Sequence, residues 1–201
     1  MDLPNAIALT GGIATGKSSV CSLLSLYGFK IIDADKIAHA KLDESLPQIA
    51  ERFGEQFVIG GRVDRKKLGG VIFSDEEARQ DLEKLLHPMI REEIVAQSEV
   101  CEAKKIPYIL DIPLFFEKGN YLIEEVAVVY CTPEQQIERL LQREGYTIEE
   151  AQSRIGAQLP IETKREKATF VIDNSADLKH LQRETERFLA YIKGRYPHLT
   201  I

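Results

Sequence analysis

The segment Gly11-Gly12-Ile13-Ala14-Thr15-Gly16-Lys17-Ser18 matches the pattern G-x-x-x-x-G-K-[ST]. It follows the apolar run 6–9 and precedes apolar residues at helical spacing, so the order is strand, glycine-rich turn and helix. This is the context that a phosphate-binding loop, or P-loop, requires. Glycines in the loop permit backbone conformations closed to other residues, and the loop directs N–H groups at a phosphate beside the start of the helix. The segment therefore predicts nucleotide binding, and it says little about the phosphate acceptor.

Within the loop we expect a division of roles between backbone and side chains. Lys17 is expected to reach the outer phosphates, and the Ser18 hydroxyl is expected to hold Mg²⁺. The residues predicted to contact the nucleotide phosphates are Gly12, Ile13, Ala14, Thr15, Gly16, Lys17, Ser18 and Ser19.

Carboxylates follow two further predicted strands. Asp33 ends the apolar run 29–33, and Asp35 lies two residues on, so the pair shares a face if the strand continues. One of them is predicted to be the base for an acceptor hydroxyl, and spacing alone does not decide which. The alternative is that Asp33 caps a helix and Asp35 is solvated. Asp111 ends the apolar strand 107–112, where an acid typically holds a metal-bound water, or else serves as a structural cap.

The alternation of strands and helices predicts an α/β three-layer P-loop NTPase fold with a parallel sheet of about five strands. Ligands bind such sheets at the carboxyl ends of the strands. The predicted strands are 5–10, 29–33, 107–112, 125–130 and 168–172, and the predicted helices around them are 17–27, 133–143, 148–158 and 177–191.

Between the second and third strands the pattern is helical for too long to be a plain crossover. We predict helices at 34–42, 46–53, 65–73, 76–86 and 88–101, with Ser74 as the cap of the fourth. The chain is therefore expected to be one domain, 1–201. Its predicted parts are a nucleotide-binding core (1–35, 106–132 and 168–201), a helical substrate-binding insertion (36–105) and a lid (133–167).

The lid is predicted from its cations. Arg139 and Arg143 are four residues apart and share a helix face, and Arg154, Lys164 and Arg165 follow in a polar stretch. A mobile, arginine-rich lid suits an enzyme that must exclude water from a reactive phosphoryl group. For any single arginine the alternative is a solvated face paired with neighbouring glutamates.

Two further segments are candidates for binding the acceptor. The apolar loop Pro113-Leu114-Phe115-Phe116-Glu117 follows the third strand, where it is either a wall for a long substrate or part of the core. His87-Pro88 and Arg91 lie in the insertion, where Arg91 and the basic residues at 62–67 either bind phosphates of a second substrate or are solvated.

Composition excludes several classes of protein. The net charge of −6 argues against a general nucleic-acid binder, and no apolar run approaches the length of a membrane span. The N-terminus has no secretory signal pattern. Three cysteines without a CxxC pair predict reduced thiols in a cytoplasmic protein and no zinc site. The oligomeric state, monomer or small homo-oligomer, cannot be predicted.

Taken in order, these motifs resemble the dephospho-CoA kinase family over essentially the whole chain. The landmarks are Leu9 to Ile13 leading into Gly16-Lys17-Ser18, then Asp33 to Ala38, His87-Pro88, Asp111 to Glu117, Arg154 to Gln158, and Val171 to Ser175. No one of them is decisive apart from the P-loop, but their order and spacing together are highly specific.

The resemblance implies transfer of the ATP γ-phosphate to the ribose 3′-hydroxyl of dephospho-CoA, which is the final step of coenzyme A biosynthesis. It implies that Asp35 is the base and that Arg143 is the lid arginine, with Arg139 as the second candidate. It also implies a substrate pocket built from the insertion and the loop 113–117. The substrate-binding candidates are His87, Arg91, Pro113, Leu114, Phe115 and Glu117.

The chain departs from the family within the P-loop. Ala14 and Thr15 stand where the family usually has Gly and Ser. These positions tolerate small side chains, so we expect little effect beyond a slight change of backbone at Ala14.

Two rival functions compete with this one. A P-loop kinase for another small hydroxyl, such as a nucleoside, gluconate or shikimate, is disfavoured by the insertion and the loop 113–117. A GTPase-type switch would need Asp-x-x-Gly and Asn-Lys-x-Asp. No aspartate here has glycine three residues on, and the nearest guanine-like stretch, 174–177, lacks the lysine.

Overall fold

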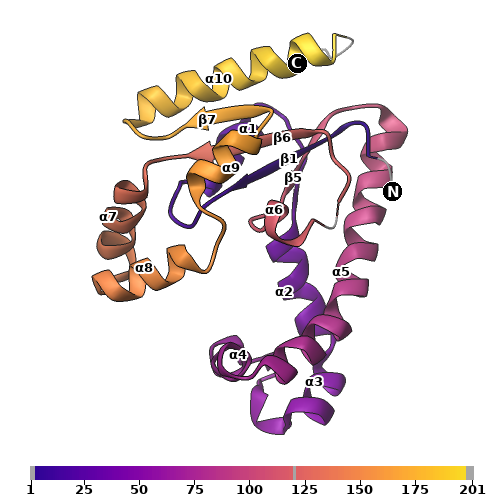
Figure 1. Ribbon diagram of the computed structural model, residues 1–201. Coiled ribbons are helices and arrows are strands. Elements are labelled where there is room, and N and C mark those ends of the chain that lie inside the picture. Colours follow the sequence, from indigo (N-terminus) through magenta and orange to yellow (C-terminus); the bar gives the residue numbers. More distant parts are fainter. Residues whose placement is uncertain (1–2, 120, 198–201) are drawn as a thin grey trace. The chain divides into compact units, whose positions relative to one another are not determined.

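The computed structural model describes residues 3–119 and 121–197, with the side chains of residues 143 and 144 outside the description. The chain divides into two compact units (Figure 1). The core unit comprises Met1–Ile32 and Val100–Ile201, and the helical unit comprises Asp33–Glu99.

A five-stranded sheet of order β2-β5-β1-β6-β7 forms the core unit's centre. The central strand, β1, pairs in parallel with both β5 and β6, and β6 pairs in parallel with β7. The strands on either side of β1 are therefore reached by crossovers in opposite directions, and ligands of open α/β sheets bind at such a switch point. The strand bounds are β1 Ala6–Gly11, β2 Ile31–Asp33, β5 Tyr108–Asp111, β6 Glu125–Tyr130 and β7 Phe170–Asp173.

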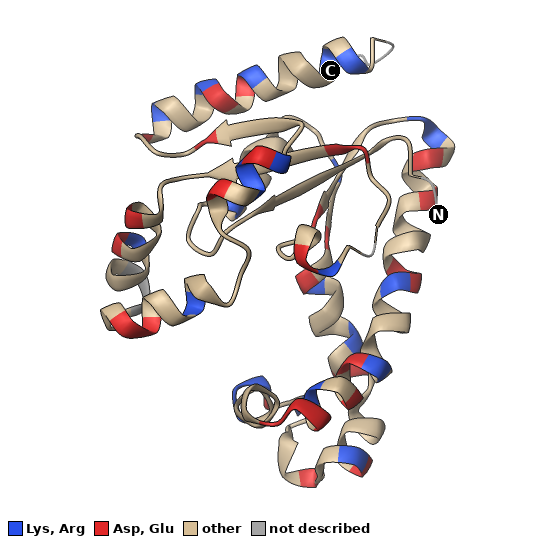
Figure 2. Ribbon diagram, viewed as in Figure 1, with Lys and Arg blue, Asp and Glu red and all other residues tan. Residues whose placement is uncertain are grey.

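Helices cover both faces of the sheet because the strands are apolar on both sides. Ala127 and Val129 of β6 belong to a core that α1 and α10 complete, whereas Val128 and Tyr130 pack with Ile161 of α9. Alternate residues of a strand point to opposite faces, so this division confirms the predicted three-layer α/β fold. Figure 2 shows that the charged residues lie mostly on the helices, while the strands are largely uncharged.

The core unit's helices agree with the predicted ones in place and extend or shorten at their ends. Two helices, α6 and α9, were not predicted: α6 begins inside the segment 113–117, which was predicted to be a loop. The second of them, α9, was hidden for another reason. It has seven residues and follows Pro160, and its signal was hidden in a polar, charged stretch. The bounds are α1 Lys17–Leu26, α6 Phe115–Lys118, α7 Pro133–Glu144, α8 Ile148–Gly156, α9 Ile161–Lys167 and α10 Leu178–Arg195.

The helical unit has an apolar core of its own, centred on Ile49, Phe57, Leu68 and Leu86. It is built mainly of helices, as its sequence predicts. The bounds are α2 Ala34–Glu44, α3 Leu46–Phe53, the 3₁₀ helix η1 Glu55–Phe57, β3 Val58–Ile59, β4 Arg62–Val63, α4 Arg65–Ser74 and α5 Glu76–Lys104, whose last turns lie in the core unit.

Two local predictions for this unit were wrong, and one hairpin was not predicted. The two helices predicted on either side of His87 are one continuous helix, α5, with Pro88 inside it; a proline removes one hydrogen bond but does not always end a helix. Gly60 and Gly61, both at positive φ, join β3 and β4 in an unpredicted antiparallel hairpin. Asp75 rather than Ser74 caps α5, because its carboxylate accepts the N–H groups of residues 77 and 78.

Candidate active site

The P-loop joins β1 to α1, and two of its residues have a left-handed backbone conformation. Gly16, the N-cap of α1, has φ +90°, and Ala14 has φ +62°. A Cβ atom at Gly16 would lie 2.1 Å from the Nδ2 atom of Asn174. Glycine at this position is therefore required both by the backbone conformation and by the space available.

The carbonyl groups of the loop are held from behind by side chains of the first turn of α7 and of the β7–α10 connection. Asn174 Nδ2 donates to the Thr15 carbonyl at 2.7 Å, and Gln136 Nε2 donates to the Ile13 carbonyl at 2.6 Å. In a trans peptide the carbonyl and the following N–H point in opposite directions. Fixing these carbonyls therefore turns the N–H groups of Ala14 and Gly16 to the opposite side, as phosphate binding requires.

Arg139 also holds the loop. A capping box at Thr132 starts α7 and sets its register, so that Gln136 and Arg139, three residues apart, share a face. The Arg139 guanidinium donates to the carbonyls of Ala14 at 3.3 Å, Thr15 at 3.4 Å and Asn174 at 2.7 Å. The structure thus brings one predicted lid arginine to the back of the P-loop. The side chain of the other, Arg143, lies outside the described residues.

Lys17 and Asp111 form an ion pair at the adjacent ends of α1 and β5. The Lys17 side chain is 18% exposed and that of Asp111 is 6% exposed. The second carboxylate oxygen of Asp111 accepts a hydrogen bond from Cys21 Sγ at 3.3 Å. Ser18 and Ser19 are exposed at the start of α1, and Ser18 directly follows the lysine that pairs with Asp111.

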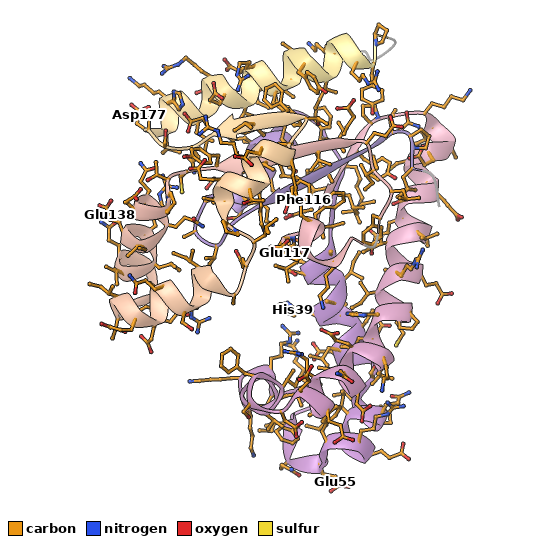
Figure 3. All side chains as sticks on the ribbon, viewed as in Figure 1. His39, Glu55, Phe116, Glu117, Glu138 and Asp177 are labelled. Atoms are coloured by element: carbon orange, nitrogen blue, oxygen red, sulfur yellow. The ribbon has the colours of Figure 1, made fainter. Side chains whose placement is uncertain are left out.

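Lys164 of α9 is fully buried, although the sequence suggested a lid cation. Its ammonium donates to the carbonyls of Gly11 at 3.0 Å and Pro113 at 3.2 Å, and it pairs with Glu117 Oε1 at 2.7 Å. The Glu117 carboxylate also accepts the Leu159 N–H at 3.0 Å. Lys164 and Glu117 therefore tie the P-loop strand, the loop 113–117 and the α8–α9 connection to one another. Figure 3 labels Glu117 on α6.

Sequence reasoning missed this role of Lys164. A lysine in a charged stretch is normally exposed, and its three partners lie far away in the sequence. The two other lid cations on described residues lie over aromatic rings instead: Arg154 over Tyr146 at 4.4 Å and Arg165 over Tyr130 at 4.7 Å.

The apolar loop 113–117 is partly committed to the core. Phe116, labelled in Figure 3, packs against the cluster of Val128, Tyr130 and Ile161. The Phe115 ring meets it edge-to-face with centroids 5.4 Å apart. The apolar side chains left to contact a substrate are those of Pro113, Leu114 and Phe115, which are half-buried. The loop therefore offers a smaller apolar surface than the sequence suggested.

The remaining candidates lie in the helical unit. Asp33 caps α2: its carboxylate accepts the Lys36 N–H at 2.9 Å and lies 3.3 Å from the Lys36 ammonium. Asp35 is exposed in the first turn of the same helix. His87 and Arg91 are exposed one turn apart on α5.

Among the described residues no three His, Cys, Asp or Glu side chains gather as a metal site, and no helix is long and apolar enough to cross a membrane. All three cysteines are free thiols. Burial raises the pKa of the Cys131 thiol, against the opposing effect of Arg139, and burial likewise raises the pKa of Cys101. These two buried thiols are packing residues.

A phosphate-binding loop after the central strand, with an acid on the neighbouring strand end, defines a nucleotide-binding protein of the P-loop class. The dephospho-CoA kinase family model matches residues 5–180. The dephospho-CoA kinase of Sulfurimonas denitrificans is 54% identical over 95% of this chain and 96% of its own length. That of Wolinella succinogenes is 45% identical over 94% of each. The chain belongs to the dephospho-CoA kinase family, which confirms the resemblance.

Solved structures agree with the sequence relatives. Dephospho-CoA kinase from Campylobacter jejuni superimposes with a TM-score of 0.74 at 35% identity, over 96% of this chain and 99% of that one. The protein TT1252 from Thermus thermophilus gives 0.78 at 34% identity, over 95% and 99%. A shikimate kinase from Acinetobacter baumannii, at 18% identity and a TM-score of 0.51, shares the fold alone.

Proposed function

We propose that this protein transfers the γ-phosphate of ATP to the ribose 3′-hydroxyl of dephospho-CoA, giving coenzyme A and ADP. The observation that carries the proposal is 54% identity to a dephospho-CoA kinase over 95% of the chain. The geometry of the P-loop supports it, because the loop carbonyls are fixed from behind and the N–H groups are turned toward a ligand.

Lys17 would serve the transferred phosphate. Its ammonium is partly exposed and pairs with Asp111, so it can exchange that carboxylate for phosphate oxygens. Phosphoryl transfer depends mainly on positioning and on stabilising charge on the equatorial oxygens. Arg143 would add a second positive charge from α7, whereas the contacts of Arg139 support a role in holding the loop.

Asp35 would accept the proton of the attacking hydroxyl. The family resemblance supports this choice, and the capping contacts with Lys36 give the Asp33 carboxylate a structural role. Asp35 is exposed in the first helical turn, where a carboxylate is accessible to a substrate.

Mg²⁺ fits the residues present. It prefers oxygen ligands and usually keeps several waters while it binds one or two protein groups plus substrate phosphates. The exposed Ser18 hydroxyl and the Asp111 carboxylate, the latter through water, would hold it. It would supply charge neutralisation at the β- and γ-phosphate oxygens.

The apolar loop 113–117 would contact part of the acceptor. Pro113, Leu114 and Phe115 offer half-buried apolar surface to a long, partly apolar substrate, and Glu117 fixes the loop through Lys164. His87 and Arg91 would contact its polar groups. We further propose a cytoplasmic enzyme, active as a monomer or small homo-oligomer, without a nucleic-acid partner.

A coupled assay of ADP release tests the function. The purified protein with ATP and Mg²⁺ should release ADP only when dephospho-CoA is added, and the product should be coenzyme A by mass. Nucleosides, gluconate and shikimate serve as competing acceptors. Turnover with one of these and none with dephospho-CoA would make the protein a kinase of another small hydroxyl.

A further inference from the structure

Gln158, in the connection between α8 and α9, contacts the P-loop from the lid side. Its side-chain oxygen Oε1 accepts the backbone N–H of Ile13 at 2.8 Å. Because an N–H can only donate, this bond fixes which end of the amide is oxygen and which is nitrogen. The NH₂ group of Gln158 is thereby oriented as well, since both ends belong to one planar group.

The position of Gln158 is set by the backbone on both sides. Its own N–H donates to Ile155 at 3.1 Å. The next N–H, of Leu159, donates to Glu117, which the buried Lys164 holds in turn. A side chain anchored in this way is preorganised and not freely rotating.

The amide nitrogen of Gln158 donates to no side chain or carbonyl in the described part of the chain, so both of its hydrogens are available. The Gln158 amide lies beside Ile13, in the first half of the P-loop, whose N–H groups are predicted to bind phosphate. The charge of a transferring phosphoryl group spreads over three equatorial oxygens. A preorganised neutral donor aimed at such an oxygen stabilises the transition state without adding charge to the site.

We propose that Gln158 is a further catalytic residue: its Oε1 stays on the Ile13 N–H while its NH₂ donates to an oxygen of the terminal phosphate of ATP. The inference rests on the proposed kinase function and assigns that site a donor besides Lys17 and the lid arginine. The competing interpretation is that Gln158 only holds the loop.

The isosteric substitution Gln158→Glu separates these two roles. A carboxylate keeps an acceptor for the Ile13 N–H but replaces the donor with a negative charge facing the phosphate. A donor role predicts that Gln158→Ala lowers kcat by about 100-fold and that Gln158→Glu lowers it further. A holding role predicts that in Gln158→Glu the added charge weakens ATP and ADP binding to the same extent and that kcat stays within about threefold of the wild type. That outcome would overturn the proposal.

Two controls keep the test specific. Gln152→Glu places the same charge on an exposed position of α8 and should leave kcat unchanged. Thermal unfolding of every variant shows whether a loss of activity reflects a loss of structure. The dissociation constant for ADP should change less than about threefold in Gln158→Ala, because ADP lacks the transferred group.

Nucleotide binding keeps this inference separate from the function on which it rests. If the wild type phosphorylates dephospho-CoA and Gln158→Glu does so equally well, only the inference fails. If the wild type does not use dephospho-CoA, the proposed function fails, and the ratio of ATP to ADP dissociation constants decides about Gln158. An increase of about tenfold in Gln158→Glu supports the donor role, and an unchanged ratio refutes it.

Discussion

Ala14 and Gly16 show how single residues shape the P-loop. Both have left-handed backbone conformations, but only Gly16 has no room for a side chain, because of Asn174. The sequence identifies Gly16 from its motif, and it marks Ala14 as a departure from the family. It does not reveal the backbone strain at Ala14, because that depends on how neighbouring segments hold the loop's carbonyls.

Ala14→Gly is expected to stabilise the protein slightly. The left-handed conformation costs an L-residue about 1–2 kcal/mol, and glycine in the unfolded chain takes back about 0.5–1 kcal/mol. Urea unfolding should therefore show a gain of about 0.5–1 kcal/mol. Gly16→Ala is the opposite case and should lose about 2 kcal/mol or more through strain and loss of the bond from Asn174 to Thr15. A Gly16→Ala variant more stable than the wild type would contradict this prediction.

Lys17→Ala is expected to lower kcat by several orders of magnitude while the protein stays folded, because charge stabilisation in the transition state is lost. Steady-state kinetics and circular dichroism on the purified variant measure the two effects. Lys179→Ala, on the exposed surface of α10, is the matched control and should behave as the wild type. Retention of more than about a tenth of the activity in Lys17→Ala would rule out its assigned role.

Asp35→Asn should lower kcat far more than it raises either KM, because the amide cannot accept the proton. Asp33→Asn should have a small effect, since an asparagine oxygen still caps α2 at the Lys36 N–H. Parallel kinetics of the two variants decide between them. If Asp33→Asn is the inactive one, the assignment within the pair is reversed.

At the scale of elements, α9 is a part of the core unit that the sequence concealed. Its residue Lys164 is as buried as the central strands, and it links β1, the loop 113–117 and the α8–α9 connection. Strands and long helices were predictable because apolar periodicity is a local signal. A buried lysine is not, because its burial follows from partners in three distant segments.

Lys164→Met should destabilise the protein by about 1–3 kcal/mol, because the carbonyls of Gly11 and Pro113 lose their buried donor and Glu117 loses its partner. Lys179→Met, at an exposed position, should cost less than about 0.5 kcal/mol. The double variant Lys164→Met, Glu117→Gln should lose less unfolding free energy than the sum of the losses of the two single variants. Additive losses in denaturant unfolding would show that the pair does not interact.

At the scale of the whole molecule, a sheet with β1 at its centre gathers the P-loop and Asp111 at one edge. This arrangement was predictable because strands with apolar runs and a P-loop at the first of them have few possible topologies. The division of the chain at residues 32–33 and 99–100 was not predictable to the residue, since the boundary falls inside β2 and close to the end of α5.

The stability of the fold should fall in acid. Burial would raise the pKa of Asp173, but hydrogen bonds from Ser175 and the nearby His180 outweigh it and lower that pKa below its usual 3.8. The pKa of Glu184 is also lowered, chiefly by Arg187. A lowered folded-state pKa stabilises above the unfolded value, and this stabilisation is lost as the pH falls through the folded one.

Asp173→Asn should therefore be less stable than the wild type at pH 7, and the difference should shrink as the pH falls below about 4. Denaturant unfolding at a series of pH values measures it, with Glu149→Gln on the exposed surface of α8 as the control. A difference that does not change between pH 7 and pH 2 would show that this carboxylate does not contribute to the acid response.

The burial of two of the three thiols has a practical consequence for spectroscopy. Cys101 and Cys131 have raised pKa values and almost no solvent contact, so alkylating reagents should leave them unmodified in the native protein. Cys21, one turn along α1 from Lys17, is the half-buried one of the three. A fluorophore or spin label attached to the native protein should thus enter at a single known position, one helical turn from Lys17.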